Sequence, residues 1–227
     1  MAQSNPKLLR VISNSAFNKS NLFAKSIHSL TWPFTVILNI SNFQLRRYAQ
    51  YFKYNYCPEV EAAVNKQILA EQQAAQDYLN MAVAFLHPYQ SRPGAGGFFM
   101  RMFDEEIGHM QDFINYQLVR GGYPVICGLK APCPKVDITM LEAFTNALNM
   151  EKHLLEQVVA AAESVKDYQC ADFVTSVFLE EQMRSVNEMA HHVTKLSKLG
   201  DDEHALYHYD LSLSKRYPWA YKRKEPG

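Results

Sequence analysis

The first 58 residues contain no aspartate or glutamate, although the whole chain has 23 acidic residues. The same region carries seven basic side chains: Lys7, Arg10, Lys19, Lys25, Arg46, Arg47 and Lys53. From residue 49 onward 17 basic residues stand against 23 acidic ones, a net charge of −6, so the neutral whole chain joins two compositions. Because nucleic-acid binding needs a basic surface, we expect no nucleic-acid partner for the acidic body.

Three other features are scarce in this sequence. Only nine of the 227 residues are glycine, which favours long helices over a sandwich of short strands. The four cysteines, Cys57, Cys127, Cys133 and Cys170, form no CxxC pair, so we expect free thiols rather than a disulfide framework. No run approaches the roughly 18 apolar residues of a membrane-spanning helix, so we expect no membrane span.

The first 48 residues are basic, free of acids and rich in serine and asparagine, a composition typical of a mitochondrial transit peptide. The run RRYAQ (46–50) places an arginine two residues before Tyr48 and predicts cleavage between Tyr48 and Ala49. We therefore expect a transit peptide over 1–48, a mature domain over 49–227 and import into the mitochondrial matrix.

Two alternatives for this segment stay open. One is a basic arm that remains attached to a cytoplasmic protein. The other is a secretory signal with LTWPFTVILNI (30–40) as its apolar core. That core contains Pro33 and Asn39, and no small-x-small cleavage site follows it.

From Glu59 onward apolar residues recur at steps of three and four, which is typical of amphipathic helices. The period predicts helices over 59–86, 95–121, 139–163 and 169–199, with a shorter fifth helix within 201–214. The four apolar stripes are Val64, Ile68, Glu71, Ala75, Tyr78, Ala82 and Phe85; Phe99, Met102, Glu106, His109, Phe113 and Tyr116; Leu141, Phe144, Leu148, Glu151, Leu155 and Val158; Thr175, Phe178, Gln182, Val186, Met189, Val193 and Leu196.

Each stripe is interrupted near its middle by residues that can bind metal: Glu71, Glu106 with His109, Glu151, and Gln182. If the four helices pack as a bundle, these side chains converge at one depth. A buried ionised carboxylate costs several kcal/mol, and three in one core repel each other. The stripes offer no Lys or Arg partner, so a pair of metal ions is the simplest remedy, and carboxylate with imidazole suits iron, manganese or zinc.

Each of these residues also has an ordinary structural interpretation. A single glutamate on an apolar stripe is usually a side chain that reaches solvent, and an isolated ExxH arises by chance in helices. Tyr78 fits equally well as core packing with a hydrogen-bonded hydroxyl. Only the coincidence across four helices favours a metal centre.

The segments between the helices predict the topology. Pro58 and the acids after it suit a helix start, Thr139 and Glu142 have capping-box spacing, and Gly200 stands where a left-handed cap ends a helix. The first and third links are short, which predicts antiparallel hairpins. The link over 122–138 is long and contains three prolines, so it can cross the length of the bundle. We therefore expect an all-α four-helix bundle with one long crossover and a short fifth helix.

Several motifs resemble those of ferritins, specifically the catalytic heavy-chain type. They are NYCPEVEAAVNKQI (55–68), EEIGH (105–109), NMEK (149–152), FLEEQ (178–182) and HVTKLSKLG (192–200). The resemblance covers about residues 55–214, nearly the whole body, and with the acid-free leader it points to a mitochondrial ferritin.

The resemblance implies a role for each candidate residue. Glu71, Glu106 and His109 would hold a first iron, with Glu106 bridging to a second iron on Glu151. Gln182 would lie beside the second iron through a water or a weak contact, and Tyr78 would hydrogen-bond into the centre. The implied reaction is oxidation of two Fe(II) by O2, followed by storage as a ferric mineral in a hollow shell of 24 subunits, homomeric or mixed with other ferritin chains.

The sequence departs from the heavy-chain pattern in two places. Gly108 and Gln111 stand where many heavy chains have further acids that face the cavity. At the three-fold channel, Asp172 matches an expected acid but Thr175 replaces a second one. These departures put fast mineral nucleation and the iron uptake route in question, and leave the oxidation centre intact.

Two other functions remain as alternatives. One is a di-iron carboxylate enzyme that acts on an organic substrate; such enzymes usually carry a second ExxH in the fourth helix, where this chain has EEQMR (180–184) without a histidine. The other is a non-catalytic shell subunit, which we would expect to have lost several of the six candidate residues.

Overall fold

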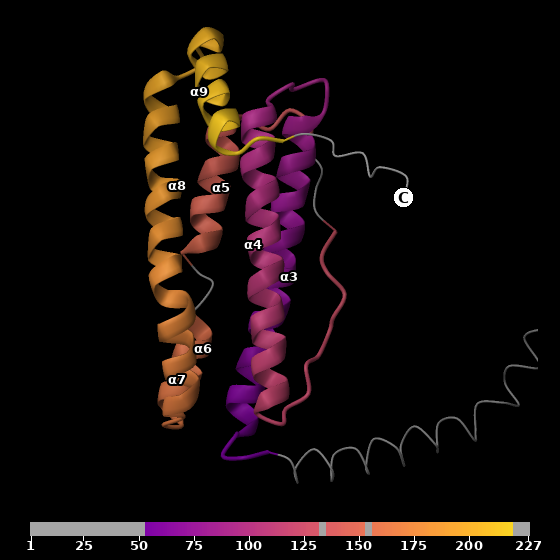
Figure 1. Cartoon of the computed structure of the whole chain (residues 1–227), viewed down its shortest axis with the longest axis vertical. Coiled ribbons are helices and arrows are strands. Elements are labelled where there is room, and N and C mark those ends of the chain that lie inside the picture. Colours follow the sequence, from indigo (N-terminus) through magenta and orange to yellow (C-terminus); the bar gives the residue numbers. More distant parts are fainter. Residues whose placement is uncertain (1–52, 132–134, 153–155, 220–227) are drawn as a thin grey trace, which may run out of the picture. The chain divides into compact units, whose positions relative to one another are not determined.

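The structure is a computed structural model and describes residues 53–131, 135–152 and 156–219, all of which belong to the unit Lys53–Gly227. The transit peptide expected over 1–48 lies outside the described residues. Every regular element among the described residues is a helix, so the predicted all-α class is confirmed (Figure 1). No described helix is both long enough and apolar enough to cross a membrane.

The helices follow the predicted order. Three correspond to single predicted helices with ends within two residues: α3 (Pro58–Leu86), α4 (Pro93–Val119) and α9 (Glu203–Arg216). The predicted fourth helix is present as α7 (Tyr168–Val174), a π-helical segment η1 (Thr175–Leu179) and α8 (Glu180–Leu199).

The helix predicted over 139–163 corresponds to two described helices, and its predicted continuity falls on residues 153–155, which the structure does not describe. The structure has α5 (Met140–Glu151) and α6 (Glu156–Ser164), with Lys152 in a turn and 153–155 outside the described residues. The Lys152 amide that caps α5 reaches the carbonyl of Leu148 at 3.4 Å, a long hydrogen bond. The apolar period does not reveal this end of α5, because periodicity reports which face is buried and not whether the backbone is continuous.

The predicted helix boundaries have clear local causes. Pro58 and Pro93 lie in the first turns of α3 and α4, where a missing backbone N–H leaves no bond unmade. Thr139 Oγ1 accepts a hydrogen bond from the Glu142 amide at 3.1 Å, which confirms the predicted cap of α5. Gly200 ends α8 as predicted and has a positive φ of +61°, but its ψ of −142° lies outside the left-handed helical region, so the predicted left-handed cap is wrong.

Helices α3 and α4 pack against each other, as do α5 and α8, and α9 packs on α4 (Figure 1). The long link after α4 lies along α3, because two α3 side chains and Gln90, just after the end of α3, bond its backbone in chain order. Asn65 accepts from the Val125 amide at 2.8 Å, Gln73 accepts from the Lys130 amide at 2.9 Å, and Gln90 donates to the Ile138 carbonyl at 2.9 Å. The link therefore spans α3 from near its start to beyond its end, as the crossover prediction requires.

Helix α9 is fixed to the start of α4 by a buried acid. Asp210 on α9 accepts hydrogen bonds from the amides of Gly94 (3.2 Å) and Ala95 (2.8 Å), which are free donors in the first turn of α4. A Cβ at position 94 would lie 2.0 Å from the Asp210 carbonyl oxygen, so this close approach of two helices requires glycine.

The apolar core consists of two clusters. The first packs around Tyr78, Phe85, Phe98, Phe99, Phe144 and Met189, and the second around Val64, Ile68, Phe113, Val174 and Phe178. Along each of the long helices the candidate polar residues fall between these clusters. Along its length the bundle therefore has an apolar layer, a polar middle layer and a second apolar layer. The candidate metal ligands lie in the polar middle layer.

Two predicted core positions are wrong. Leu141 is 37% exposed and Thr175 is exposed, while Ala143 and Ala147 are buried in their helix's place. Alanines occupy part of the buried face of α5. The stripe predicted from larger apolar residues is therefore rotated around the helix axis relative to the face that is buried. The structure does not describe the side chains of Leu155 and Val158. Within the described residues, Cys57, Cys127 and Cys170 are free thiols, while Cys133 lies outside them.

Candidate metal centre

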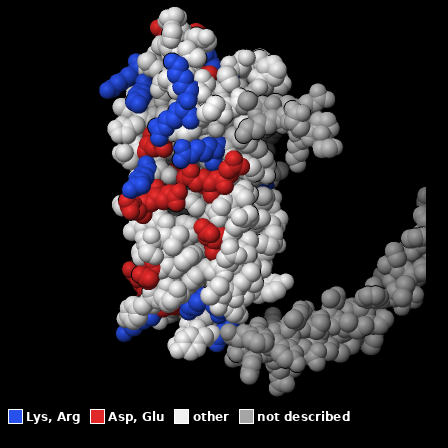
Figure 2. Space-filling view, viewed as in Figure 1, with Lys and Arg blue, Asp and Glu red and all other residues white. Residues whose placement is uncertain are grey.

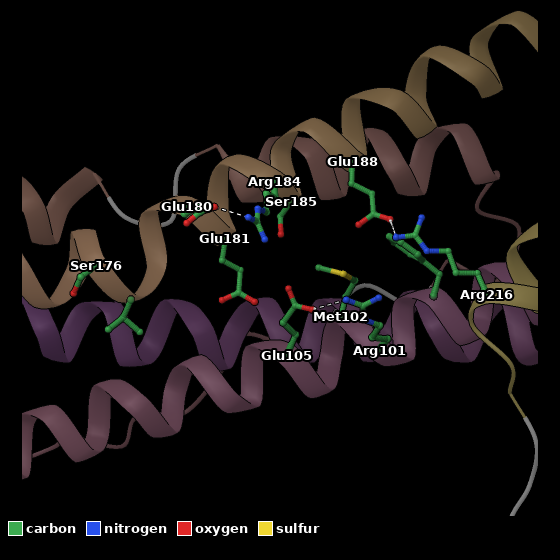
Figure 3. Close-up of a pocket in the computed structure, with 12 residues that line it drawn as sticks. Arg101, Met102, Glu105, Ser176, Glu180, Glu181, Arg184, Ser185, Glu188 and Arg216 are labelled. Carbon is green, nitrogen blue, oxygen red and sulfur yellow. Dashed lines mark hydrogen bonds and ion pairs between the residues drawn. The ribbon is translucent and has the colours of Figure 1, made fainter.

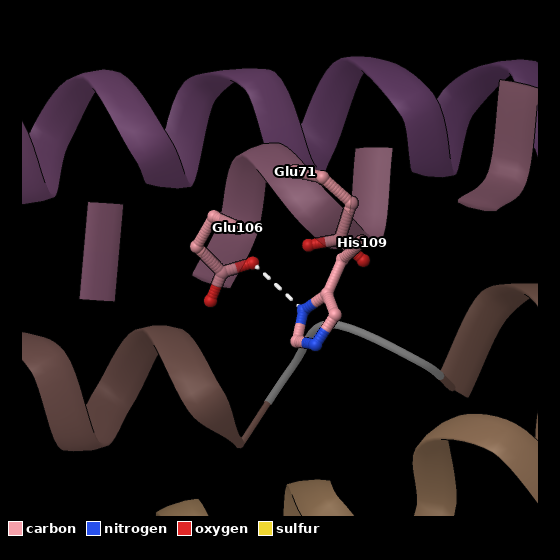
Figure 4. A group of neighbouring side chains, drawn as sticks. All are labelled: Glu71, Glu106 and His109. Carbon is pink, nitrogen blue, oxygen red and sulfur yellow. Dashed lines mark hydrogen bonds and ion pairs between the residues drawn. The ribbon is translucent and has the colours of Figure 1, made fainter. Parts of the chain in front are cut away.

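The structure brings together three of the candidate residues as one group. Glu71 on α3 and Glu106 and His109 on α4 place one ligand atom each within 4.8 Å of the others (Figure 4). Glu106 and His109 share a helix face because they are three residues apart, and the His109 Nδ1 atom lies 3.3 Å from Glu106 Oε2. Both glutamates are only 1% exposed, so their carboxylates are out of water.

The electrostatics of this group are unfavourable in the absence of a cation. Burial, followed by the negative charge of Glu106, raises the pKa of Glu71 well above its ordinary value. Burial is also the main cause that raises the pKa of Glu106 to about 8. Glu71 Oε1 accepts from Gln67 at 2.7 Å, but Glu71 Oε2 is buried and has no hydrogen-bond partner among the described residues.

The remaining three candidates form a second group joined by hydrogen bonds. Glu151, the last residue of α5, accepts at Oε1 from the Tyr78 hydroxyl (2.5 Å) and at Oε2 from Gln182 Nε2 (2.5 Å). Gln182 Nε2 also lies 2.7 Å from the Glu151 carbonyl oxygen. Burial and then the negative charge of Glu151 raise the pKa of Tyr78 well above its ordinary value, so the phenol stays neutral and donates.

The two groups are electrostatically coupled. Burial is the main cause that raises the pKa of Glu151, the negative charge of Glu71 raises it further, and a charge on His109 would lower it. The negative charge of Glu151 in turn raises the pKa of Glu106. Three helices thus bring three carboxylates within electrostatic reach, and α8 contributes Gln182.

Two acids beside this centre were missed in the sequence. The side chain of Glu105 is only 18% exposed, and burial raises its pKa. Glu181 Oε2 lies 3.4 Å from His109 Nε2, and Glu105, His109 and Glu181 form a second group with ligand atoms within 4.8 Å. Glu181 directly precedes Gln182, so the FLEEQ motif held a signal that could have identified it.

Glu105 and Glu181 also line a pocket between α4 and α8 (Figure 3). The pocket mixes charges: Arg101 lies 3.7 Å from Glu105, and Arg184 pairs with Glu180. Acidic and basic side chains likewise adjoin on the face shown in Figure 2. The buried carboxylates therefore lie behind a polar, open approach rather than behind a continuous apolar wall.

The π-helical segment lies directly before the acids of α8. Phe178 within η1 is buried, stacks on Phe113 with ring centroids 4.5 Å apart, and meets the His109 ring edge-on at 5.4 Å. The contact with Phe178 restricts the position of the His109 imidazole ring from the side of η1. Single π turns are rare within α-helices, and those that occur are frequently at functional sites.

His192, on α8, lies in the core and away from the candidate metal ligands. It is 7% exposed, stacks on Phe144 with ring centroids 4.6 Å apart, and shares a 2.5 Å hydrogen bond with the Tyr209 hydroxyl on α9. It therefore belongs to the core beneath α9.

Glu71, Glu106 and His109 fit a metal ion. A buried carboxylate with one oxygen that lacks a donor, beside a second carboxylate and an imidazole, is the arrangement that a cation stabilises, since it can bind all three at once. Oxygen and nitrogen ligands of this kind suit iron, manganese or zinc.

Comparisons with known proteins identify the family. The ferritin-like domain of the ferritin family matches residues 61–199. The soma ferritin of Lymnaea stagnalis is 36% identical over 149 residues, which are 64% of this chain and 86% of that protein. The chain belongs to the ferritin family.

Other ferritins are similar to a comparable degree. Ferritin-1 heavy chain of Schistosoma mansoni is 33% identical over 65% of this chain and 87% of its own length, and the chloroplastic ferritin-3 of Vigna unguiculata is 32% identical over 70% of this chain and 64% of its own. The crystal structure of ferritin from the green alga Ulva pertusa matches with a TM-score of 0.69 and 31% identity, over 73% of this chain and 88% of that one.

Family membership confirms the coarser part of the functional prediction. Ferritins bind and store iron in multi-subunit shells, and ferroxidase activity is general in the family. The relatives of this ferritin include animal and chloroplastic plant proteins.

Proposed function

We propose that this chain is a catalytic, heavy-chain-type ferritin subunit that oxidises Fe(II) with O2 at a dinuclear centre inside the subunit. The observation that carries the proposal is the buried Glu71 carboxylate, which lies beside Glu106 and His109 and has one oxygen without a hydrogen-bond donor. A non-catalytic subunit has no need to bury such an unfavourable group, because apolar residues of similar volume are at least as stable.

In this proposal the two groups hold different substrate ions. Glu71 and His109 bind the first Fe(II), Glu106 bridges, and Glu151 binds the second Fe(II) with Gln182 beside it. Tyr78 holds the Glu151 carboxylate through its 2.5 Å hydrogen bond. Two Fe(II) each give one electron to O2, which takes up two protons and leaves as hydrogen peroxide. The ferric product then leaves, because Glu151 and the shared Glu106 are the only carboxylates proposed to hold the second ion.

The first experiment uses the purified metal-free protein. Two Fe(II) per chain are added without oxygen, O2 is admitted, and Fe(III) formation is followed against O2 consumed. Fast oxidation at about two irons per chain, followed by uptake of many more, supports a ferroxidase that supplies a store. Retention of only two irons would instead indicate a fixed di-iron enzyme with an organic substrate, and absence of oxidation would indicate a non-catalytic shell subunit.

We also propose that residues 1–48 form a mitochondrial transit peptide on a mature chain of 49–227. The support is the basic, acid-free composition before residue 59. A fusion of residues 1–48 to a fluorescent protein should enter mitochondria and be shortened after Tyr48. The alternative is a cytoplasmic protein with a basic arm, for which the fusion would stay in the cytosol at full length; delivery to plastids would also contradict the mitochondrial assignment.

We propose assembly into a 24-subunit shell, homomeric or shared with other ferritin chains. Native mass spectrometry of the purified chain distinguishes a closed 24-mer from smaller assemblies. At the expected three-fold channel Asp172 and Thr175 are both exposed, and the Thr175 hydroxyl donates to the Ala171 carbonyl at 2.8 Å. The proposed channel then carries fewer charges, so Thr175→Glu should speed iron uptake.

A further inference from the structure

Helix α9 carries two exposed histidines that contact each other. His204 and His208 are four residues apart, and their ring centroids are separated by 4.6 Å at an interplanar angle of 77°. Two histidines at this spacing project from the same helix face, which is the arrangement that helical metal sites use.

Neither ring has a recorded hydrogen bond to another described residue. Other described histidines do have partners: His87 Nδ1 accepts from the Tyr89 amide at 3.1 Å, and His192 bonds Tyr209. The ring nitrogens of His204 and His208 are therefore available to a ligand from solvent.

The backbone beneath the pair is held firmly. Asp202 caps α9 by accepting from the amides of His204 (2.9 Å) and Ala205 (3.2 Å), and Asp210 fixes the next turns to α4. Binding then requires little ordering of the chain, which lowers its entropic cost. The acids Asp201 and Asp202 precede the pair and favour a cation over an anion, while Glu203 pairs with Arg92.

We propose that His204 and His208 form a bidentate site for a late first-row divalent cation, separate from the iron-oxidation centre. Metal–nitrogen bonds of about 2.0–2.1 Å require the two ligand nitrogens to lie roughly 3 Å apart, which rings already in contact reach by side-chain rotation. Among the described residues no third His, Cys, Asp or Glu side chain joins this pair, so water completes the coordination. Two imidazoles with water suit Cu(II) best, with Ni(II) and Zn(II) weaker.

Binding at this site has a structural consequence. A cation that joins two successive turns of α9 binds the folded helix only, so it stabilises α9 as its concentration exceeds the dissociation constant. Because α9 supplies Asp210 to α4 and Tyr209 to His192, the cation would also strengthen the attachment of α9 to the bundle.

The test uses the full chain with Glu71→Ala and His109→Ala, so that the oxidation centre does not compete for the metal. This parent is titrated with Cu(II) and followed by calorimetry and electron paramagnetic resonance. We expect one bound Cu(II) per chain whose spectrum shows coupling to two nitrogens, and its loss when His204→Ala and His208→Ala are added. Each single substitution should weaken binding by at least about 10-fold.

His191→Ala is the matched control, because it removes another exposed histidine from a neighbouring helix. It should leave both the affinity and the two-nitrogen spectrum unchanged. Equal Cu(II) binding by the parent and the His204/His208 double variant would overturn the proposal, as would a loss of equal size in the His191→Ala control. Circular dichroism tests separately whether the double variant folds, because its spectrum should match that of the parent.

Discussion

The polar middle layer has two halves, the group of Glu71, Glu106 and His109 and the group of Glu151, Tyr78 and Gln182, whose buried glutamates differ in hydrogen bonding. Glu151 accepts hydrogen bonds from Tyr78 and Gln182, so both of its oxygens have donors. Glu71 has one donor, in Gln67, and one buried oxygen with none. Both halves are buried, and only one is satisfied by the protein itself.

The difference indicates a division of labour. A carboxylate whose two oxygens both accept hydrogen bonds is held by its donors in one orientation before any ion arrives. An unsatisfied one stores unfavourable energy that a cation releases on binding. We therefore expect the Glu71 side to supply most of the affinity for iron, and the Glu151 side to supply orientation.

The largest expected effect comes from removing the unsatisfied side. Glu71→Ala with His109→Ala should reduce the rate of Fe(II) oxidation by more than about 100-fold, because two direct ligands are lost where even a supporting residue costs about 10- to 100-fold. The initial rate of Fe(III) absorbance after O2 is admitted measures this loss. The shell should still assemble, since the change removes buried charge rather than contacts between subunits.

A matched control removes the same residue types from the surface. Glu163→Ala with His191→Ala concerns two exposed side chains, and it should retain the parental rate. Parental oxidation by the Glu71/His109 variant would show that the centre has been assigned to the wrong residues.

The second prediction concerns how the free energy of unfolding of the metal-free chain depends on pH, because this dependence reports the cost of burying Glu106 without a cation. Burial raises the pKa of Glu106 from 4.5 to about 8, so between these values the folded metal-free chain holds a proton that the unfolded chain has released. The unfolded state binds fewer protons there, and the free energy of unfolding falls as pH rises, by at most about 1.4 kcal/mol per pH unit for one group.

Chemical denaturation of the metal-free protein at pH 5, 6, 7 and 8 tests this dependence. Glu106→Gln should have a flatter profile than the parent, because the amide does not titrate. The exposed-site variant Glu163→Gln should follow the parent. Identical slopes for Glu106→Gln and the parent would mean that Glu106 does not hold this proton.

Much of this architecture was predictable from the sequence, because helical periodicity is a local property. The positions of Glu71, Glu106 and His109 on buried faces follow from steps of three and four between apolar residues. The cap at Thr139 and the helix end at Gly200 follow from residue type and position alone.

The remainder depends on contacts between distant segments. Glu105 and Glu181 become neighbours of His109 only after α4 and α8 pack together, and neither lies on an apolar stripe. His192 is buried because α9 folds over it, which the pattern of α8 alone does not show. Small buried residues such as Ala143 misled the choice of the α5 face, since size and burial are different properties.

The third prediction compares Glu71→Gln with Glu151→Gln, each of which replaces a buried glutamate by an amide of similar shape. Glu71→Gln should raise the free energy of unfolding of the metal-free chain at pH 8 by about 1 kcal/mol or more, because the buried Glu71 carboxyl group must either take up a proton on folding or carry a charge beside Glu106, and an amide does neither. Glu151→Gln should lower it by about 1–3 kcal/mol, because an amide cannot accept from both Tyr78 and Gln182. Urea denaturation with metal removed gives both values, and changes of the same sign would remove the contrast between the two halves.

The smallest expected effect is that of Tyr78→Phe, which deletes one donor from the satisfied side and keeps the ring stacked on Phe99 at 6.1 Å. Loss of this hydrogen bond should lower the free energy of unfolding by about 1 kcal/mol. Because Glu151 is then less well oriented, the second Fe(II) should bind more weakly while the first binds as before, which anaerobic Fe(II) titration resolves. The control Tyr168→Phe removes an exposed hydroxyl, and should change neither value. Weakening of the first Fe(II) instead would show that Tyr78 serves the Glu71 side, and that the two halves act as one unit.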